Sequence, residues 1–252
     1  MSTRPKKEYG QHFLRDANIL GVVGRLAELG PDDVVLEIGP GEGVLTRYLA
    51  ERVRRVRAVE IDRSLESALS GLADNVDVVF GDALRLALPQ DATKLVANLP
   101  YNVATPLVVE SLDGLPNIRL WCVMVQREVA EHLFAEPGTK EYGAVSVLVQ
   151  LTTERTGFHP VSRTVFRPQP NVDSALVAFR RTELPAAYER VKEVVTAAFA
   201  HRRKTLPNSL ALAGAASREQ AAEGLVAIGH PPETRAEALA PTEFVMLAEA
   251  LG

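Results

Sequence analysis

The four residues Asn98-Leu99-Pro100-Tyr101 have the chemistry to hold an amino group on a flat aromatic ring. The Asn98 amide oxygen and the Leu99 carbonyl can both accept hydrogen bonds from one exocyclic NH2 group. Pro100 fixes its own φ and brings no backbone donor that would compete for these acceptors. Tyr101 adds an aromatic face, on which a stacked base typically gains about 1–3 kcal/mol. The pattern predicts a site for a base that carries an amino group. An ordinary Asn–Pro turn after a strand has the same residue pattern, so the motif alone leaves both interpretations open.

Three further polar features follow predicted strands upstream. The run Glu37–Gly43 contains glycines that let the backbone approach a ligand closely. Its G-x-G-x-G spacing differs from the G-x-G-x-x-G of dinucleotide folds, and Pro40 and Glu42 suit a pyrophosphate poorly. Glu60 ends the next strand, where a carboxylate can accept both ribose hydroxyls, and Asp82 follows a third, within reach of an adenine amino group. Together they predict a nucleoside ligand that carries a zwitterionic amino-acid tail instead of phosphates.

Short apolar segments alternate with amphipathic ones through the first 143 residues. This rhythm predicts an α/β fold with a doubly wound, parallel sheet, whose strand ends bring the polar residues together. The expected strands are 33–38, 56–61, 76–80, 94–97 and 120–125, and the expected helices are 17–29, 44–52, 64–72, 106–112 and 127–134.

After Gly143 the rhythm changes. Residues 144–153 and 173–180 are strand-like and are joined only by a Pro-containing connection, so we expect an antiparallel hairpin at one edge of the sheet. Beyond residue 185 no strand candidate remains, and Ala and Glu dominate. We therefore predict two domains, 1–182 and 183–252, the second a small all-α domain. Its expected helices are 188–201, 217–228 and 241–251.

The composition of the 252 residues is that of an ordinary globular protein, with 46% hydrophobic and 24% charged residues. No apolar run approaches the roughly 20 residues that span a bilayer. The first residues lack the apolar core of a secretory signal, and the single cysteine, Cys122, suits a reducing compartment. With no metal-type His/Cys spacing either, we expect a cytoplasmic protein without a membrane segment or a metal.

The net charge of −4 hides local clusters of cations. Clusters of this kind can grip phosphates locally without a basic pI. We expect phosphate contacts from the second and third of them. The three clusters are Arg4, Lys6 and Lys7; Arg52, Arg54, Arg55 and Arg57; and Arg202, Arg203 and Lys204.

These features together resemble one known family, the S-adenosylmethionine-dependent rRNA adenine N6,N6-dimethyltransferases, and most of all the branch that acts on small-subunit rRNA. The resemblance extends over nearly the whole chain, and its later motifs are not generic methyltransferase features. It is carried by Tyr9–Leu14, Gly39–Gly43, Asn98–Asn102, Thr105–Leu107, Gln126–Ala130, Tyr142-Gly143, Phe166-x-Pro168-x-Pro170-x-Val172-Asp173-Ser174 and Arg202–Leu206.

The resemblance implies a Rossmann-like class I methyltransferase sheet and methyl transfer from S-adenosylmethionine to N6 of adenosines, two adjacent ones near the 3′ end of small-subunit rRNA. It implies a monomer that acts on an assembling 30S particle and contributes to the maturation of the small subunit. The catalytic corner would be Asn98–Tyr101, with Phe166 as a second aromatic wall opposite Tyr101, and Arg202, Arg203 and Lys204 would contact RNA. The cofactor pocket would be lined by His12, Leu14, Gly39, Gly41, Glu60, Asp82 and Asn98.

Other functions stay open at this point. One is an adenine methyltransferase of the macrolide-resistance type, which acts on large-subunit rRNA. Another is a ribosome-assembly factor whose binding matters more than its catalysis. A nucleotide-dependent dehydrogenase is disfavoured by the glycine spacing and by the Asn-Leu-Pro-Tyr turn.

Overall fold

The computed structural model describes residue 6 and residues 9–252, so Arg4 and Lys7 of the first basic cluster lie outside the described part. The chain forms two compact units. The first runs to Ala130 and resumes over Glu154–Arg181, and the second comprises Glu131–Thr153 and Thr182–Gly252. The predicted division at residue 182 differs from this one, because it leaves residues 131–153 with the first domain.

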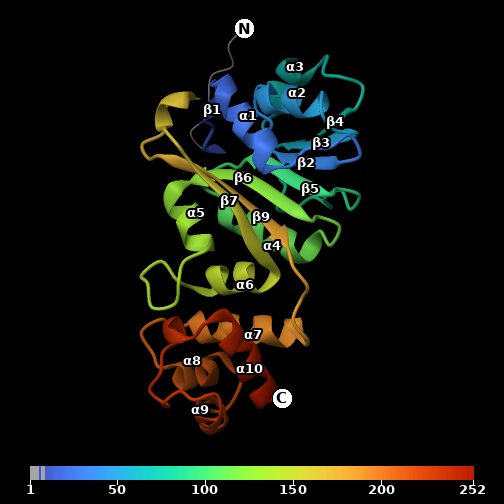
Figure 1. Ribbon diagram of the computed structural model, residues 1–252. Helices are drawn as coiled ribbons and strands as arrows, with labels where there is room; N and C mark the ends of the chain where they lie inside the picture. Colours follow the sequence, from blue (N-terminus) through green and yellow to red (C-terminus); the bar gives the residue numbers. More distant parts are fainter. Residues whose placement is uncertain (1–5, 7–8) are drawn as a thin grey trace. The chain divides into compact units, whose positions relative to one another are not determined.

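Within the described residues, seven strands form the central sheet in the order β4-β3-β2-β5-β6-β9-β7 (Figure 1). The strands β2 to β6 pair in parallel, and β9 runs antiparallel to β6. The predicted, mostly parallel sheet with an antiparallel edge is thereby confirmed. The strands are β2 (Val34–Ile38), β3 (Arg55–Glu60), β4 (Val76–Phe80), β5 (Lys94–Asn98), β6 (Leu120–Gln126), β7 (Thr153–Val161) and β9 (Ser174–Arg181).

The sheet is covered on both faces, which explains its continuous apolar strands. Every residue of β2 is buried. On one face, Val35 shares a core cluster with α1 and α2, and on the other the buried Trp121 of β6 donates a hydrogen bond to Ser111 of α4 at 2.8 Å. The helices around the sheet are α1 (Ala17–Leu26), α2 (Val44–Ala50), α3 (Glu66–Leu69), α4 (Ala104–Gly114) and α5 (Arg127–Leu133).

The prediction of a strand over residues 144–153 is wrong. These residues form helix α6 (Ala144–Thr152), and the edge strand β7 begins only at Thr153. A short apolar run rich in Val fits a buried strand and a buried helix equally well, so its pattern alone does not decide. Here Val147 and Leu148 belong to the core of the second unit, where α6 packs on α7.

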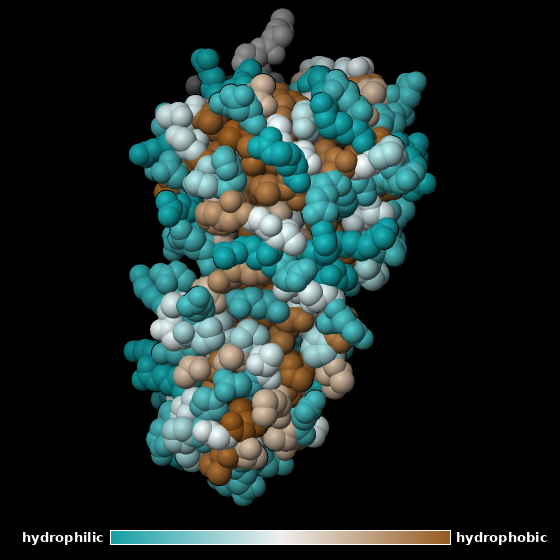
Figure 2. Space-filling model, in the orientation of Figure 1, coloured by the Kyte–Doolittle hydropathy of each residue, from teal (hydrophilic) through white to brown (hydrophobic). Residues whose placement is uncertain are grey.

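The second unit is built from α6 and four later helices around its own apolar core. One of them, α8, was not predicted, although Pro207 in its first turn and Gly214 at its end in the left-handed region are ordinary helix signals. On the face drawn in Figure 2, hydrophilic side chains are interspersed with smaller apolar patches. The helices are α7 (Tyr188–Phe199), α8 (Leu206–Ala213), α9 (Arg218–Ala227) and α10 (Pro241–Leu251).

No helix in the described part of the chain has the length and apolar character that crossing a membrane requires.

Candidate active site

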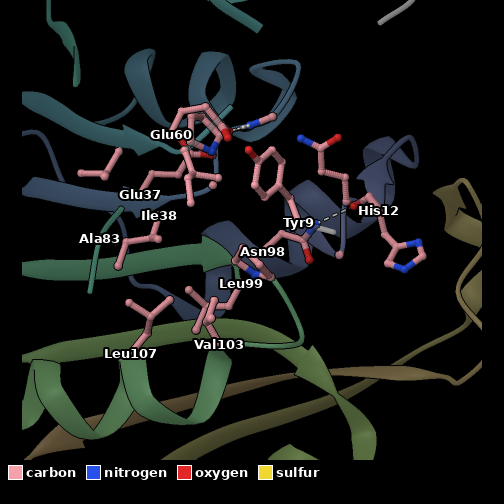
Figure 3. A pocket seen from close by; sticks show the side chains of 18 of the residues that line it. Tyr9, His12, Glu37, Ile38, Glu60, Ala83, Asn98, Leu99, Val103 and Leu107 are labelled. Carbon is pink, nitrogen blue, oxygen red and sulfur yellow. Dashed lines mark hydrogen bonds between the residues drawn. The ribbon is translucent and has the colours of Figure 1, made fainter. Parts of the chain in front are cut away.

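A cavity lies at the carboxyl ends of the parallel strands and is lined by residues of the first unit. Open α/β sheets bind their ligands at this edge. Figure 3 shows Glu60 and Asn98 facing the cavity from strands on either side of β2, with Tyr9 between them. The predicted residues that line it are His12, Leu14, Gly39, Gly41, Glu60, Asp82, Asn98, Leu99, Pro100 and Tyr101.

The glycine loop follows β2 and adopts a conformation that side chains would disturb. Gly39 has φ of +76°, and a Cβ there would lie 3.4 Å from the ring of Pro100. Gly41 has φ of +59°, and a Cβ there would lie 2.8 Å from the ring of Phe13. Gly39 is therefore restricted to glycine by its conformation, and Gly41 by its conformation as well as by space. The loop is held close to the cavity on one side and to the N-terminal segment on the other.

Glu60, at the end of β3, is a buried carboxylate held by the backbone. Its Oε2 accepts a hydrogen bond from the Gly41 N–H at 3.0 Å, and its Oε1 accepts one from the Asp62 N–H at 2.9 Å. Burial raises the pKa of Glu60, and these backbone donors offset part of the rise. A carboxylate fixed in this way keeps further lone pairs that can accept the hydroxyls of a ribose.

Asp82 follows β4 and is fixed by its own turn. Its Oδ1 accepts a hydrogen bond from the Leu84 N–H at 3.0 Å, and its Oδ2 lies 3.4 Å from the Arg85 Nε.

Glu37 was not predicted as a site residue, although a carboxylate inside the apolar strand β2 was a usable signal. It is fully buried, and its Oε2 has no hydrogen-bond partner. Burial raises the pKa of Glu37 to about 8, and the nearby Glu60 adds to the rise.

The charge of the cavity fits a cationic nucleoside. The described lining residues include four acidic ones, Glu37, Glu42, Glu60 and Asp82, and no Lys or Arg. Glu37, with its pKa of about 8, is mostly protonated at neutral pH, so the negative charge comes from the other three. A pyrophosphate would be repelled here, whereas a sulfonium and an ammonium group would be attracted. The unpartnered buried oxygen of Glu37 is a further acceptor for such a group. The residues present therefore fit S-adenosylmethionine.

Asn98 ends β5 with an oriented amide. Its Nδ2 donates to the backbone carbonyl of His12 at 2.9 Å, and its Oδ1 is buried without a hydrogen-bond partner. An unpartnered buried acceptor costs about 1–3 kcal/mol, so such atoms are rare outside functional sites. The amide orientation leaves an acceptor beside the cavity for an N–H of a ligand.

Tyr101 stands next to this acceptor and is held at its hydroxyl. The hydroxyl shares a hydrogen bond with the Ser174 hydroxyl of β9, and burial raises the pKa of Tyr101. The ring of His12 lies 5.4 Å from the Tyr101 ring, tilted by 32°. Tyr101 is thus a fixed aromatic platform with His12 beside it.

The N-terminal segment is fastened to the sheet at several points. Lys6 and Gln11 both bond the Asp62 carboxylate, at 2.6 and 3.0 Å. Burial alone would raise the pKa of Asp62, but these bonds and those from Ser64 hold it well below its usual range. His12 Nδ1 lies 2.8 Å from the Pro168 carbonyl. The segment therefore forms one wall of the cavity.

Phe166 is not brought to the cavity. The strand β8 (Phe166–Arg167) pairs antiparallel with β1 (Phe13–Leu14), and Leu14 stands opposite Phe166. Phe166 is only 4% exposed and belongs to the main core cluster of the first unit, whereas Leu14 lines the cavity from the same pairing. In this structure the ring beside Tyr101 is that of His12, and the role of Phe166 as a second wall stays a prediction.

The cluster at Arg52–Arg57 is a poor candidate for RNA contacts. It precedes or opens β3, so it lies at the opposite edge of the sheet from the cavity. Arg57 bonds Asp77 and Asp91, both at 2.7 Å, and Arg55 pairs with Asp77. Arg55 and Arg57 are thus paired with neighbouring carboxylates, whereas Arg54 is exposed, and phosphate contacts from this cluster stay a prediction.

The other cluster consists of Arg202–Lys204. All three residues are exposed, but their side chains differ in the bonds that they make. The Arg202 guanidinium donates to the carbonyls of Lys140 and Tyr142, at 3.2 and 3.3 Å, so it ties together two parts of the second unit. Among the described residues, the side chains of Arg203 and Lys204 make no comparable bonds.

Comparisons with known proteins identify the family of this chain. A family model described as ribosomal RNA adenine dimethylase matches residues 2–249. Two proteins named ribosomal RNA small subunit methyltransferase A are similar to the chain. The one from Rubrobacter xylanophilus is 49% identical over 251 residues, covering 97% of this chain and 94% of its own length. The one from Streptomyces coelicolor is 46% identical over 264 residues, covering 99% and 92%.

Solved structures of known proteins are also similar to this chain. The 23S rRNA methyltransferase ErmE is 33% identical with a TM-score of 0.69, over 95% of this chain and 99% of its own. A dimethyladenosine transferase from Plasmodium falciparum shares the fold, with a TM-score of 0.77 at 23% identity over 94% and 96% of the two chains. This chain belongs to the ribosomal RNA adenine dimethylase family.

Proposed function

We propose that this protein transfers methyl groups from S-adenosylmethionine to N6 of adenosines in small-subunit rRNA, and that it dimethylates them. The observation that carries the proposal is the Asn98 amide, whose Oδ1 is buried without a partner at the rim of an acidic cavity. An adenine amino group supplies the donor that this oxygen lacks. The family and the names of its relatives support the same reaction.

The cofactor, when bound, supplies an electrophilic methyl group on a cationic sulfur. Glu60 would hold its ribose hydroxyls and Asp82 its adenine amino group. The carboxylates of Glu42, Glu60 and Asp82, which line the cavity, would favour the cationic donor. Gly39 and Gly41 would let the backbone lie close against it.

On the acceptor side, N6 is a poor nucleophile because its lone pair is delocalised into the purine ring. Asn98 Oδ1 and the Leu99 carbonyl, by accepting the N6 hydrogens, would favour a pyramidal nitrogen whose lone pair points at the methyl carbon. N6 would thereby be oriented to accept the methyl group that the cofactor supplies, and its surplus proton would pass to water. The protein thus contributes orientation and electrostatic preorganisation. Tyr101 would hold the extruded base by stacking.

The substrate proposal extends to two adjacent adenosines near the 3′ end of the RNA, within an assembling 30S particle in the cytoplasm. We propose that the protein works there as a monomer and needs no metal. The names of the relatives support the small-subunit branch over the large-subunit branch, which the 23S rRNA methyltransferase ErmE represents among the similar structures. An additional role in assembly is compatible with catalysis.

The experiment is methyl transfer to separated RNAs. The purified protein is incubated with methyl-labelled S-adenosylmethionine and with small- or large-subunit rRNA that lacks the modification, free or in particles. Label recovered as N6,N6-dimethyladenosine from small-subunit RNA is the expected result. Label in large-subunit RNA alone, or in neither RNA, would contradict the proposal.

A further inference from the structure

A second, more polar pocket lies in the first unit beside the platform residue Tyr101. It has a volume of about 270 Å³ and is separate from the cofactor cavity, with which it shares no lining residue. Its lining residues are Gln126, Arg127, Glu128, Arg163, Asn171, Val172 and Asp173.

The strand pairing connects this pocket to the acceptor corner. Tyr101 bonds the Ser174 hydroxyl, and Ser174 stands opposite Gln126 in the β6–β9 pairing. Gln126 is itself a wall of the pocket, and the Arg127 N–H donates to the Asp173 carbonyl at 3.0 Å. The pocket therefore begins directly beside Ser174, the residue that holds the Tyr101 hydroxyl.

Arg163 presents a fixed planar group in the pocket. Its Nη1 donates to the Asn171 carbonyl at 3.0 Å, and its Nε lies 3.8 Å from the Asp173 carboxylate. The same carboxylate accepts from the Arg163 backbone N–H at 3.1 Å, so both ends of the residue are held. The side chain is still 48% exposed. A guanidinium that is held at its edge and open on its face is a stacking surface for an unpaired base.

The remaining chemistry favours a base over a phosphate. The pocket contains two arginines and two carboxylates, those of Glu128 and Asp173, so it carries no net positive charge to attract an anion. The amides of Gln126 and Asn171 instead offer both donors and acceptors for the edge of a base.

We propose that this pocket binds the nucleobase that flanks the target adenosine, stacked on the Arg163 guanidinium. This inference rests on the proposed function, because it takes RNA as the substrate. It assigns the recognition of sequence context to the β6–β9 end of the sheet, apart from the acceptor corner.

The test combines a base deletion with a side-chain change. The probe is a short, fluorescently labelled single-stranded RNA with one central adenosine, and two further copies have an abasic ribose directly 5′ or 3′ of it. Dissociation constants are measured by anisotropy for the full-length protein and its Arg163→Lys and Arg163→Gln variants. Arg119→Lys is the matched control, because Arg119 is exposed directly before β6, at the opposite edge of the sheet.

We expect one of the abasic RNAs to bind the unaltered protein about tenfold more weakly than the intact RNA. Both Arg163 variants should lose a similar factor on the intact RNA and show no further loss on that abasic RNA. The Lys variant should bind the intact RNA no more tightly than the Gln variant, because lysine retains the positive charge but lacks the planar guanidinium on which a base can stack. The control should behave like the unaltered protein.

Three outcomes would overturn the inference. The first is equal affinity of the unaltered protein for all three RNAs, which tests the pocket even if the variants fold poorly. The second is full affinity of the Lys variant with loss only in the Gln variant, which indicates a phosphate contact. The third is an undiminished abasic penalty in both variants. Methyl transfer to the intact RNA is recorded separately, so that failure of the proposed function is visible apart from failure of the pocket.

Discussion

Replacing Asn98 by alanine should abolish most of the activity while leaving the fold nearly unchanged in stability. The substitution removes the hydrogen bond to the His12 carbonyl, worth about 0.5–1.5 kcal/mol. It also removes the buried, unpartnered Oδ1, whose presence costs about 1–3 kcal/mol. The two effects have opposite signs and similar size, so we expect the melting temperature to change by only a few degrees.

The effect on catalysis should be much larger. Removal of one preorganised group that stabilises a transition state typically lowers kcat by about 10²–10³-fold. Single-turnover methyl transfer with saturating cofactor and RNA measures this step, and thermal unfolding measures stability. Asn117→Ala is the matched control, because Asn117 also donates from its Nδ2 to one carbonyl, that of Gln90 at 2.8 Å, but lies outside the cavity.

Asn117→Ala should retain nearly full kcat. If Asn98→Ala retained kcat within about threefold of the unaltered protein, the assigned role would be refuted. A kcat loss that appeared equally in the Asn117 control would also contradict it, because the cause would then be general destabilisation.

Three further predictions concern the loop, the buried acid and the basic cluster. Gly41→Ala should weaken cofactor binding measured by calorimetry and lower stability by about 1–3 kcal/mol, because φ is +59° and the new Cβ would meet the Phe13 ring. Glu37, with its pKa raised to about 8, binds a proton in the folded state that it lacks when unfolded above its ordinary pKa of about 4.5. Its stabilising effect is therefore complete at low pH and is lost as pH rises towards 8, by at most about 1.4 kcal/mol per pH unit. The free energy of unfolding, measured as a function of pH, should no longer show this fall in Glu37→Gln. An unchanged slope would contradict the assignment of the pH dependence to Glu37. Arg203→Gln should reduce the slope of log Kd for RNA against log salt by about 0.7–0.9, whereas Arg202→Gln should mainly lower the melting temperature.

The sheet and much of the cavity were predictable because local signals and the fold agree there. The five strands expected before residue 126 are all present, with ends displaced by at most one residue. Short runs of Val, Ile and Leu between turn residues are typical of strands that are covered on both faces. Glu60 and Asp82 come together because parallel strands end at the same edge of the sheet.

What was missed depends on distant parts of the chain. Residues 144–152 are helical because their side chains pack into the core of the second unit, which local pattern does not reveal. The burial of Phe166 accompanies the pairing of β8 with β1, about 150 residues earlier in the sequence, and its role as a second wall stays a prediction. The orientation of the Asn98 amide likewise depends on the carbonyl of His12, which no spacing rule connects to it.

The central claim is that Asn98 Oδ1 receives the amino group of the target adenine beside the methyl donor. A crystal structure of the protein with S-adenosylhomocysteine and an RNA containing the target adenosine tests it most directly. We predict that N6 lies within hydrogen-bonding distance of Asn98 Oδ1, with the ring on Tyr101 and the cofactor sulfur directly behind N6. An adenine bound elsewhere, with Asn98 Oδ1 still enclosed by protein alone, would contradict the account.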